Sequence, residues 1–260
     1  MPYPSTTRGS RAAGILAFAY GLAAYALFLA VFVYAIAFVA DAYFVPKTID
    51  RGGLGSGDFT AVALLADVAL LTLFALQHSA MARPGFKRWW TKFVPRSVER
   101  STYVVASSIC LATLVVFWFP ITAPLWDVTA QPWRGLLVAV SMAGWALVLT
   151  STLLINHFDL FGMRQVFLRL RQRQPAPDSF VTPAFYRIVR HPLYLGFLVA
   201  FWVTPNMTAG HLLFAAATTG YILIAIQLEE RDLVGTFGHQ YHDYRARVPM
   251  LIPRPRLTRG

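Results

Sequence analysis

Long apolar runs alternate with short polar segments along the whole chain. The runs cover Gly14–Ala40, Phe59–Ala80, Thr102–Phe119, Gly135–Ile155, Pro192–Val203 and Leu212–Leu228. A bilayer core about 30 Å thick needs about 20 apolar residues of helix to cross it. The pattern therefore predicts five to six transmembrane helices. The fifth run is short, which leaves two interpretations open: it forms half of a helical hairpin, or it is a re-entrant piece.

The polar segments between the runs divide the chain into parts. Phe158–Arg173 mixes apolar residues with four arginines, a pattern typical of a helix that lies along a membrane surface. We therefore expect front helices over residues 1–156, an interfacial amphipathic segment over 157–189, and a helical hairpin with a tail over 190–260. Trp118, Trp126 and Trp133 border an outer loop and predict an interfacial aromatic belt.

The composition agrees with this pattern. Hydrophobic residues make up 57% of the 260 positions and charged residues 13%, which is wrong for a soluble globular domain. No segment between the runs is large enough for a separate soluble domain. The predicted fold class is all-α: a single integral membrane domain, residues 1–260, built as a polytopic helix bundle.

The net charge of +11 is unevenly distributed. Twenty of the 23 basic residues precede the first run or lie in 81–101, in 157–191 or after Glu230. This alternation follows the positive-inside rule, so both termini and the basic loops are predicted to be cytoplasmic. The charge thus reports topology and contact with the lipid bilayer. We expect no nucleic-acid partner, and no obligate protein partner is evident.

One cysteine, Cys110, occurs in the chain, and it lies inside an apolar run. A single cysteine excludes an intramolecular disulfide and a cysteine metal cluster. No metal site is expected.

Four polar sets occur where the runs meet the predicted cytoplasmic face. They are Gln77-His78-Ser79 with Arg83; Asn156-His157-Phe158-Asp159; Arg190-His191-Pro192 with Tyr194; and Gln227 with Glu229-Glu230. Ionisable groups at such positions are costly and point to function or to a partner. Each set alone has a structural explanation: the histidines could bond neighbouring carbonyls, and the glutamates could pair with Arg190 or Arg231. Four sets at one depth favour a site.

The last two sets indicate what the site binds. Pro192 suits the first position of a helix, whose free amides would favour an anion. His191 and Tyr194 share a face of that helix, with Arg190 at its mouth, and Gln227 and Glu230 share a face of the next. Opposite charges that face each other would match a zwitterionic amino-acid group, as in S-adenosylmethionine.

Longer motifs resemble a known family. Arg190–Gly196, Glu229-Glu230-x-x-Leu233, Phe237-Gly238-x-x-Tyr241-x-x-Tyr244 and Val248-Pro249-x-x-Ile252-Pro253 resemble the isoprenylcysteine carboxyl methyltransferase superfamily. Gln77–Lys87 and Asn156–Gly162 are similar to its NnrU-related branch, and within it to bacterial enzymes that methylate methanethiol to dimethyl sulfide and can also methylate hydrogen sulfide.

The resemblance implies roles for individual residues. It implies an S-adenosylmethionine cofactor and a small thiol substrate, in an enzyme of the bacterial inner membrane with a cytoplasmic site. His191, Tyr194, Leu195, Glu229 and Glu230 would contact the cofactor, with Gln227 beside them. Arg190 would orient the cofactor's carboxylate, and Tyr241 and Tyr244 would close over its adenosine. Gln77, His78, Ser79 and Arg83 would line the substrate side.

A thiol must lose its proton before it can attack a methyl group, so a base or a positive potential must help. We favour Asn156, His157 and Asp159 as the catalytic set, with Tyr194 as an orienting hydroxyl and His78 as another candidate base. Other functions stay open: methylation of a lipid or another thiol, or haem ligation by His78 and His157 in an electron-transfer protein. A transporter is weaker, because only Asp67 lies deep inside a run.

Overall fold

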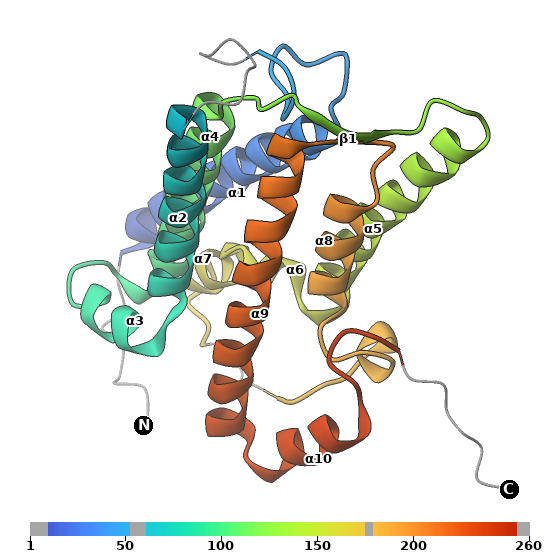
Figure 1. The fold of residues 1–260 in the computed structure, drawn as a ribbon. Coiled ribbons are helices and arrows are strands. Elements are labelled where there is room, and N and C mark those ends of the chain that lie inside the picture. The colour runs from blue at the N-terminus through green and yellow to red at the C-terminus, as the bar shows by residue number, and fades with distance from the viewer. Residues whose placement is uncertain (1–9, 53–60, 175–178, 254–260) are drawn as a thin grey trace, which may run out of the picture.

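Five long helices form the body of the molecule (Figure 1). The structure is a computed structural model, and it describes residues 10–52, 61–174 and 179–253. The long helices are α1 (Arg11–Val39), α2 (Ala61–Ala82), α4 (Arg96–Phe117), α5 (Trp133–Ile155) and α9 (Ala209–Phe237). Each is long and apolar enough to cross a membrane. The prediction of an all-α polytopic membrane bundle is confirmed. The expected first residue of the second run, Phe59, lies outside the described residues.

Shorter elements connect these helices. They are α3 (Pro84–Trp90), β1 (Pro124–Asp127), α6 (His157–Leu160), α7 (Met163–Leu170), a 3-10 turn η1 (Ala184–Arg187), α8 (Pro192–Trp202), β2 (Asn206–Thr208) and α10 (His239–Arg247). The two strands pair antiparallel, with Pro124 opposite Thr208 and Asp127 opposite Asn206.

The bundle has two chemically different ends. One end, low in Figure 1, holds the C-terminal ends of α2 and α5 and the starts of α4 and α8; we call it the polar end. There Ser79 of α2 contacts Tyr221 of α9, and Arg83 pairs with Asp232. The other end carries β1 and β2, and we call it the strand end. The four polar sets therefore occur at one end of the bundle, as their spacing along the chain predicted.

The fifth run crosses the bundle only with help from an extended segment. The eleven residues of α8 span about 16 Å at 1.5 Å per residue, too little for a bilayer core. The chain then continues to β2, which pairs with β1 at the strand end. Non-helical backbone at membrane depth must be buried and bonded. Accordingly, Met207 is fully buried, and the Ala200 and Phe201 carbonyls accept hydrogen bonds from Ser141 Oγ (3.1 Å) and His211 Nε2 (2.9 Å).

Very close packing joins α8 to α5. A Cβ atom on Gly196 would lie 2.7 Å from the Gly144 carbonyl oxygen and 2.9 Å from the Val148 nitrogen. A Cβ on Gly144 would lie 2.7 Å from the Ala200 nitrogen. Small residues allow such backbone approach in membrane bundles, where dispersion drives helix association. The contact fixes the start of α8 against the end of α5.

Polar groups lock the strand end. Asp67 of α2 is completely buried and accepts a hydrogen bond from the Phe119 amide (2.9 Å). Lys47 Nζ donates to the Trp118 carbonyl at 2.9 Å. Trp118 is itself fully buried, and its Nε1 donates to the Ile49 carbonyl (3.1 Å). The expectation that Trp118 belongs to an interfacial belt is therefore wrong, because tertiary packing encloses it among α1, α4 and α9.

The amphipathic segment packs against the bundle. Val166 of α7 is buried against Gly21 of α1. Gly162, with φ of +83°, approaches the Ser101 nitrogen of α4 so closely that a Cβ would lie 2.7 Å away. Part of the predicted segment 157–189, residues 175–178, lies outside the described residues. The boundaries of that segment stay a prediction.

Candidate functional site

The start of α8 and the end of α9 meet in a buried ion-pair cluster. Arg190 Nε lies 2.7 Å from Glu230 Oε1, and His191 Nε2 lies 3.1 Å from the same oxygen. The Arg190 and Glu230 side chains are only 10% and 6% exposed. The antiparallel hairpin thus brings the two charged sets together, as the sequence predicted. These opposite charges bind each other, however, and do not flank an open gap.

The C-terminal tail completes the cluster. The Arg190 and His191 amides donate to the carbonyls of Pro249 (2.8 Å) and Met250 (3.2 Å). Arg190 Nη1 donates to the Val248 carbonyl (2.6 Å), so its guanidinium holds the tail. Arg245 of α10 also lies 3.5 Å from Glu230 Oε2. Arg190 is therefore placed as a structural clamp, and Arg245 is a member of the cluster that sequence reasoning missed.

Glu229 has a different environment from its neighbour. Its side chain is 43% exposed, and its Oε2 lies 4.0 Å from His191 Nδ1. Tyr194 interacts with it electrostatically from α8. Successive helical residues point about 100° apart, so adjacent carboxylates reach different surroundings. Of the two glutamates, Glu229 is the one open to a ligand.

The tail tyrosines are enclosed by the segment before α8. Tyr241 and Tyr244 are buried, and the Tyr244 hydroxyl donates to the Tyr186 carbonyl (2.6 Å). The Phe180 ring packs edge-on against both. Burial raises the pKa of Tyr244 to about 12, so its hydroxyl stays protonated. The predicted contact with adenosine stays a prediction, and Phe180 and Tyr186 are neighbours that no sequence motif indicated.

Two other predicted cofactor residues differ in exposure. Gln227 is exposed on α9, whereas Glu230, three residues later, is buried. Leu195 packs beside Tyr194 on an apolar cluster of Ile222, Ile226 and Leu251. Leu195 is therefore part of the apolar packing between α8 and α9. Gln227 and Glu230, which we expected on one face of the helix, differ in burial.

His78 lies in a polar cluster between α2 and α4. The Tyr103 hydroxyl is 2.9 Å from its Nε2 and 3.1 Å from its Nδ1, and Ser107 Oγ is 3.2 Å from Nδ1. The imidazole stacks on Phe74, with centroids 5.3 Å apart. Tyr103 is 9% exposed. Tyr103 and Ser107 lie outside every motif, and only their position four residues apart on an apolar helix could have suggested them.

The rest of the Gln77 set ties α2 to α9. Ser79 Oγ donates to the Tyr221 hydroxyl at 3.4 Å, and Arg83 Nη1 pairs with Asp232 at 3.0 Å. Gln77 Nε2 lies 3.1 Å from Met81 Sδ. Tyr194 of α8 interacts electrostatically with both Tyr221 and Tyr103. The Gln77 set therefore adjoins the hairpin, and its role on the substrate side stays a prediction.

The Asn156 set makes its contacts with α1, α5 and α7, away from the hairpin. His157 is buried, with Nε2 at 2.7 Å from the Tyr25 hydroxyl and Nδ1 at 2.9 Å from Thr152 Oγ1. Burial lowers the pKa of His157 below its ordinary value of 6.5, so the ring is neutral. Asp159 pairs with Arg164 (3.1 Å), and Asn156 Oδ1 accepts from the Asp159 amide (3.3 Å). Within the described residues, these contacts join α1, α5 and α7, and not the hairpin.

One arginine connects the Asn156 set to the His78 cluster. Arg100 of α4 donates from Nε to the Leu160 carbonyl of α6 (2.9 Å). Its guanidinium also lies over the Tyr103 ring, 5.6 Å from the centroid. Because both ring nitrogens of His78 and of His157 lie at hydrogen-bonding distance from protein hydroxyls, the contacts do not favour haem ligation by this pair.

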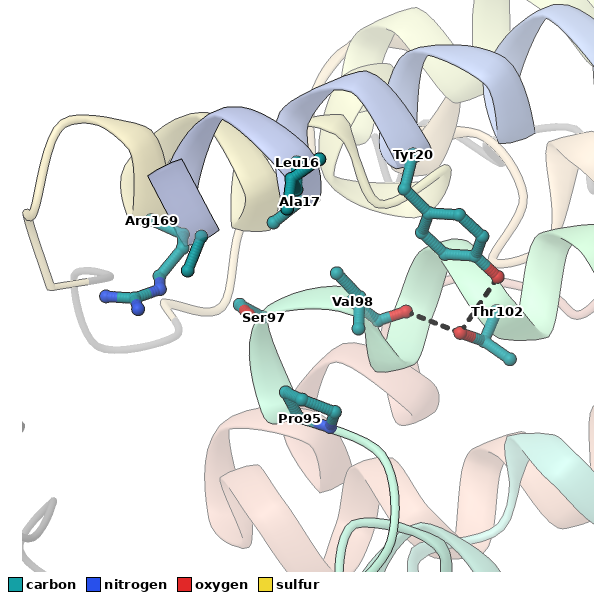
Figure 2. Close-up of a pocket in the computed structure, with 9 residues that line it drawn as sticks. Leu16, Ala17, Tyr20, Pro95, Ser97, Val98, Thr102 and Arg169 are labelled. Carbon is teal, nitrogen blue, oxygen red and sulfur yellow. Dashed lines mark hydrogen bonds between the residues drawn. The ribbon is translucent and has the colours of Figure 1, made fainter. Parts of the chain in front are cut away.

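A separate cavity of about 440 Å³ opens between α1, α4 and α7 (Figure 2). Its lining is mostly apolar, with Arg169 at one side and a Tyr20–Thr102 hydroxyl contact (3.1 Å) at another. It contains none of the predicted site residues. In the part of the chain that the structure describes, no group of three or more metal-ligating side chains occurs.

Comparison with known proteins identifies relatives over nearly the whole chain. It is 53% identical over 235 residues to methanethiol S-methyltransferase 2 of Bradyrhizobium diazoefficiens, covering 90% of this chain and 89% of that protein. It is 52% identical over 236 residues to methanethiol S-methyltransferase of Mycobacterium tuberculosis (91% and 95% covered). Nurim of Rattus norvegicus is 30% identical over 186 residues (68% and 70% covered). No protein-family model matches, and no solved structure does.

Proposed function

The chain belongs to the family of methanethiol S-methyltransferases, and from this premise we propose that it transfers the methyl group of S-adenosylmethionine to methanethiol, giving dimethyl sulfide. The observation that carries the proposal is the identity of about one half to proteins of that name over nine tenths of the chain. The protein is a methyltransferase embedded in a membrane by five apolar helices.

The hairpin is the proposed site of the methyl donor. Half-buried Glu229 of α9 lies 4.0 Å from His191 and interacts with Tyr194 of α8, and its carboxylate would accept hydrogen bonds from the ammonium group of S-adenosylmethionine. The bound donor would supply an electrophilic methyl group on a sulfonium. Glu229 would hold the ammonium by a charge-assisted hydrogen bond. Arg190, Glu230 and the docked tail would keep this edge rigid, with Leu195, Gln227, Tyr241 and Tyr244 around it.

The Gln77 set is the proposed substrate side. Gln77, His78 and Ser79 lie on α2, and Arg83 follows the last residue of that helix. Ser79 and Arg83 contact α9 of the hairpin, through Tyr221 and Asp232. Transfer of a methyl group from a sulfonium to a thiolate neutralises charge, so apolar surroundings that exclude water favour it. The surrounding helices would chiefly supply alignment of the thiol with the methyl group. Asn156, His157 and Asp159 would position the α5–α6 corner, with Tyr194 as the orienting hydroxyl.

We also propose that the protein lies in the bacterial inner membrane, with the polar end and both termini in the cytoplasm. The support is the excess of basic residues in the segments at the polar end. A cytoplasmic site would have direct access to S-adenosylmethionine, while an apolar thiol could arrive through the bilayer.

Gas-phase detection tests the proposal. Purified protein in lipid nanodiscs receives methanethiol and S-adenosylmethionine, and the headspace is sampled for dimethyl sulfide. We expect release that requires both reactants and is lost with Glu229→Ala. Absence of dimethyl sulfide from folded wild-type protein would reject the function. A second arm supplies hydrogen sulfide, for which the product is methanethiol, and a third supplies an isoprenylated cysteine, for which no product is expected.

A further inference from the structure

Titratable side chains from α2, α4 and α9 gather beside the hairpin in an otherwise apolar bundle. His78, Tyr103 and Tyr221 form its centre: the Tyr103 hydroxyl lies 2.9 Å from His78 Nε2, and the Tyr221 ring is edge-on to His78 with centroids 6.5 Å apart. Polar side chains at such depth carry a cost that function commonly explains.

Two cations flank the cluster. The Arg100 guanidinium lies over the Tyr103 ring at 5.6 Å, and both Arg100 and Arg83 act electrostatically on the Tyr103 hydroxyl. Lys87 of α3 interacts electrostatically with the same two arginines. A positive potential at this point favours a thiolate over a thiol. The cations would therefore stabilise the thiolate, and the contact of Tyr103 with His78 Nε2 would give the thiol's proton a place to go.

The cluster also reaches the proposed donor site. Tyr194 interacts electrostatically with Glu229 of the proposed donor site and with Tyr221 and Tyr103 of the cluster. Tyr194 additionally packs on the Ile222–Ile226 cluster of α9. A small thiol beside Tyr194 would therefore be near both the His78 cluster and the proposed donor site.

We propose that the His78–Tyr103 pair, and not His157, takes the proton from the thiol. This inference rests on the proposed function. The thiol S–H bond breaks and its proton passes to the Tyr103 oxygen, while Tyr103 gives its own proton to His78 Nε2. The thiolate sulfur forms a bond to the methyl carbon of the sulfonium donor, and the electron pair of the broken carbon–sulfur bond stays on the donor's sulfur.

The Asn156 set acts on this pair from a distance. Leu160 of α6 accepts a hydrogen bond from Arg100, and the close approach of Gly162 to Ser101 holds that segment against α4. Arg100 in turn covers Tyr103. Asn156, His157 and Asp159 are therefore positioning residues that keep the cation over the proton-accepting pair.

The test compares two thiols of different acidity. Tyr103→Phe removes one hydroxyl, and Tyr20→Phe is the matched control, since Tyr20 contacts Thr102 outside the cluster (Figure 2). With methanethiol, we expect Tyr103→Phe to lower kcat about 100-fold, the usual contribution of general base catalysis. With hydrogen sulfide, which ionises more readily, we expect a loss of about 10-fold or less. Tyr20→Phe should leave both rates unchanged.

Binding of S-adenosylhomocysteine, measured by calorimetry, separates this role from damage to the fold. We expect Tyr103→Phe to bind it as the wild type does. His78→Gln is the second variant, because its amide can keep a hydrogen bond to Tyr103, and the same dependence on thiol acidity is expected. Equal losses with the two thiols, or wild-type kcat in both variants, would overturn the inference. If wild-type protein itself forms no dimethyl sulfide, the proposed function fails first.

Discussion

Two adjacent carboxylates, Glu229 and Glu230, show how one residue step changes a role. Glu230 is buried against Arg190 and His191, whereas the Glu229 side chain is 43% exposed. The motif that contains both residues indicates a donor site but does not say which one binds. The structure separates a carboxylate that holds the fold together from one that is available to a ligand.

Glu229→Gln and Glu230→Gln test this separation with the same chemical change at neighbouring positions. We expect Glu229→Gln to weaken S-adenosylhomocysteine binding about 10-fold, the loss of one hydrogen bond to a charged group, with Tm unchanged. Glu230→Gln leaves Arg190 and His191 without their anion, so we expect about 3 kcal/mol of destabilisation and a lower Tm. Calorimetry and thermal unfolding measure the two effects. The reverse assignment would show that Glu230 is the ligand contact.

His157 gives a prediction about pH. Burial lowers the pKa of His157 below 6.5, so the unfolded chain binds this proton more readily than the folded protein. The contribution of His157 to the free energy of unfolding is therefore present above pH about 6.5 and is lost as the pH falls below that value. We expect His157→Gln to flatten the dependence of Tm on acid pH, while exposed His239→Gln leaves it as in the wild type. Identical pH profiles for all three proteins would contradict the burial argument.

At the scale of elements, a contact between two glycines packs α8 of the hairpin against α5. The pattern of the fifth run indicates a short apolar helix, but it contains no sign of its partner. Gly196 faces Gly144 of α5, fifty-two positions earlier, at backbone distances that no side chain fits. The same contact fixes where α8 begins, and so where His191 and Tyr194 stand.

Gly196→Ala is expected to destabilise the protein, and Gly220→Ala to be harmless. A Cβ on Gly196 would lie under 3 Å from three α5 atoms, so the helices must separate, at a cost of about 1–3 kcal/mol. A Cβ on Gly220 meets nothing within 4 Å, and alanine favours helix by about 0.5–1 kcal/mol. Thermal unfolding in detergent compares them. A Tm for Gly196→Ala equal to that of the wild type would refute the packing argument.

For the whole molecule, the fold makes α8 with the extended segment to β2 a sixth crossing of the bundle. With the five long helices of the described residues, this composite crossing would put Arg11 and Pro253 on the same side of the membrane. The distribution of basic residues supports our proposal that this side is the cytoplasm. In the proposed orientation, the polar end and its titratable groups would face the compartment that supplies the proposed methyl donor.

Reporter fusions in a bacterial host test this topology. Green fluorescent protein fused after Gly260 should be fluorescent, because that reporter folds in the cytoplasm. Alkaline phosphatase fused after Val128, near β1, should be active, because it requires the periplasm, and the same enzyme fused at the C-terminus should be inactive. Active phosphatase at the C-terminus would mean that α8 does not complete a crossing.

The sequence by itself determined the membrane class, the five long helices, the end of the bundle at which polar groups occur, and the Arg190–Glu230 hairpin. These follow from local properties: apolar length, loop charge and the position of polar residues relative to helix ends. Only the tertiary structure decided that Glu230 is paired while Glu229 is exposed, that Trp118 is buried, and that His78 adjoins Tyr103 while His157 adjoins Tyr25. Each of these depends on which helix faces which, at residue separations from 25 to 132 positions. Apolar helices in lipid carry little information about their partners, because nearly every face is hydrophobic; close backbone contacts and a few buried hydrogen bonds choose among them.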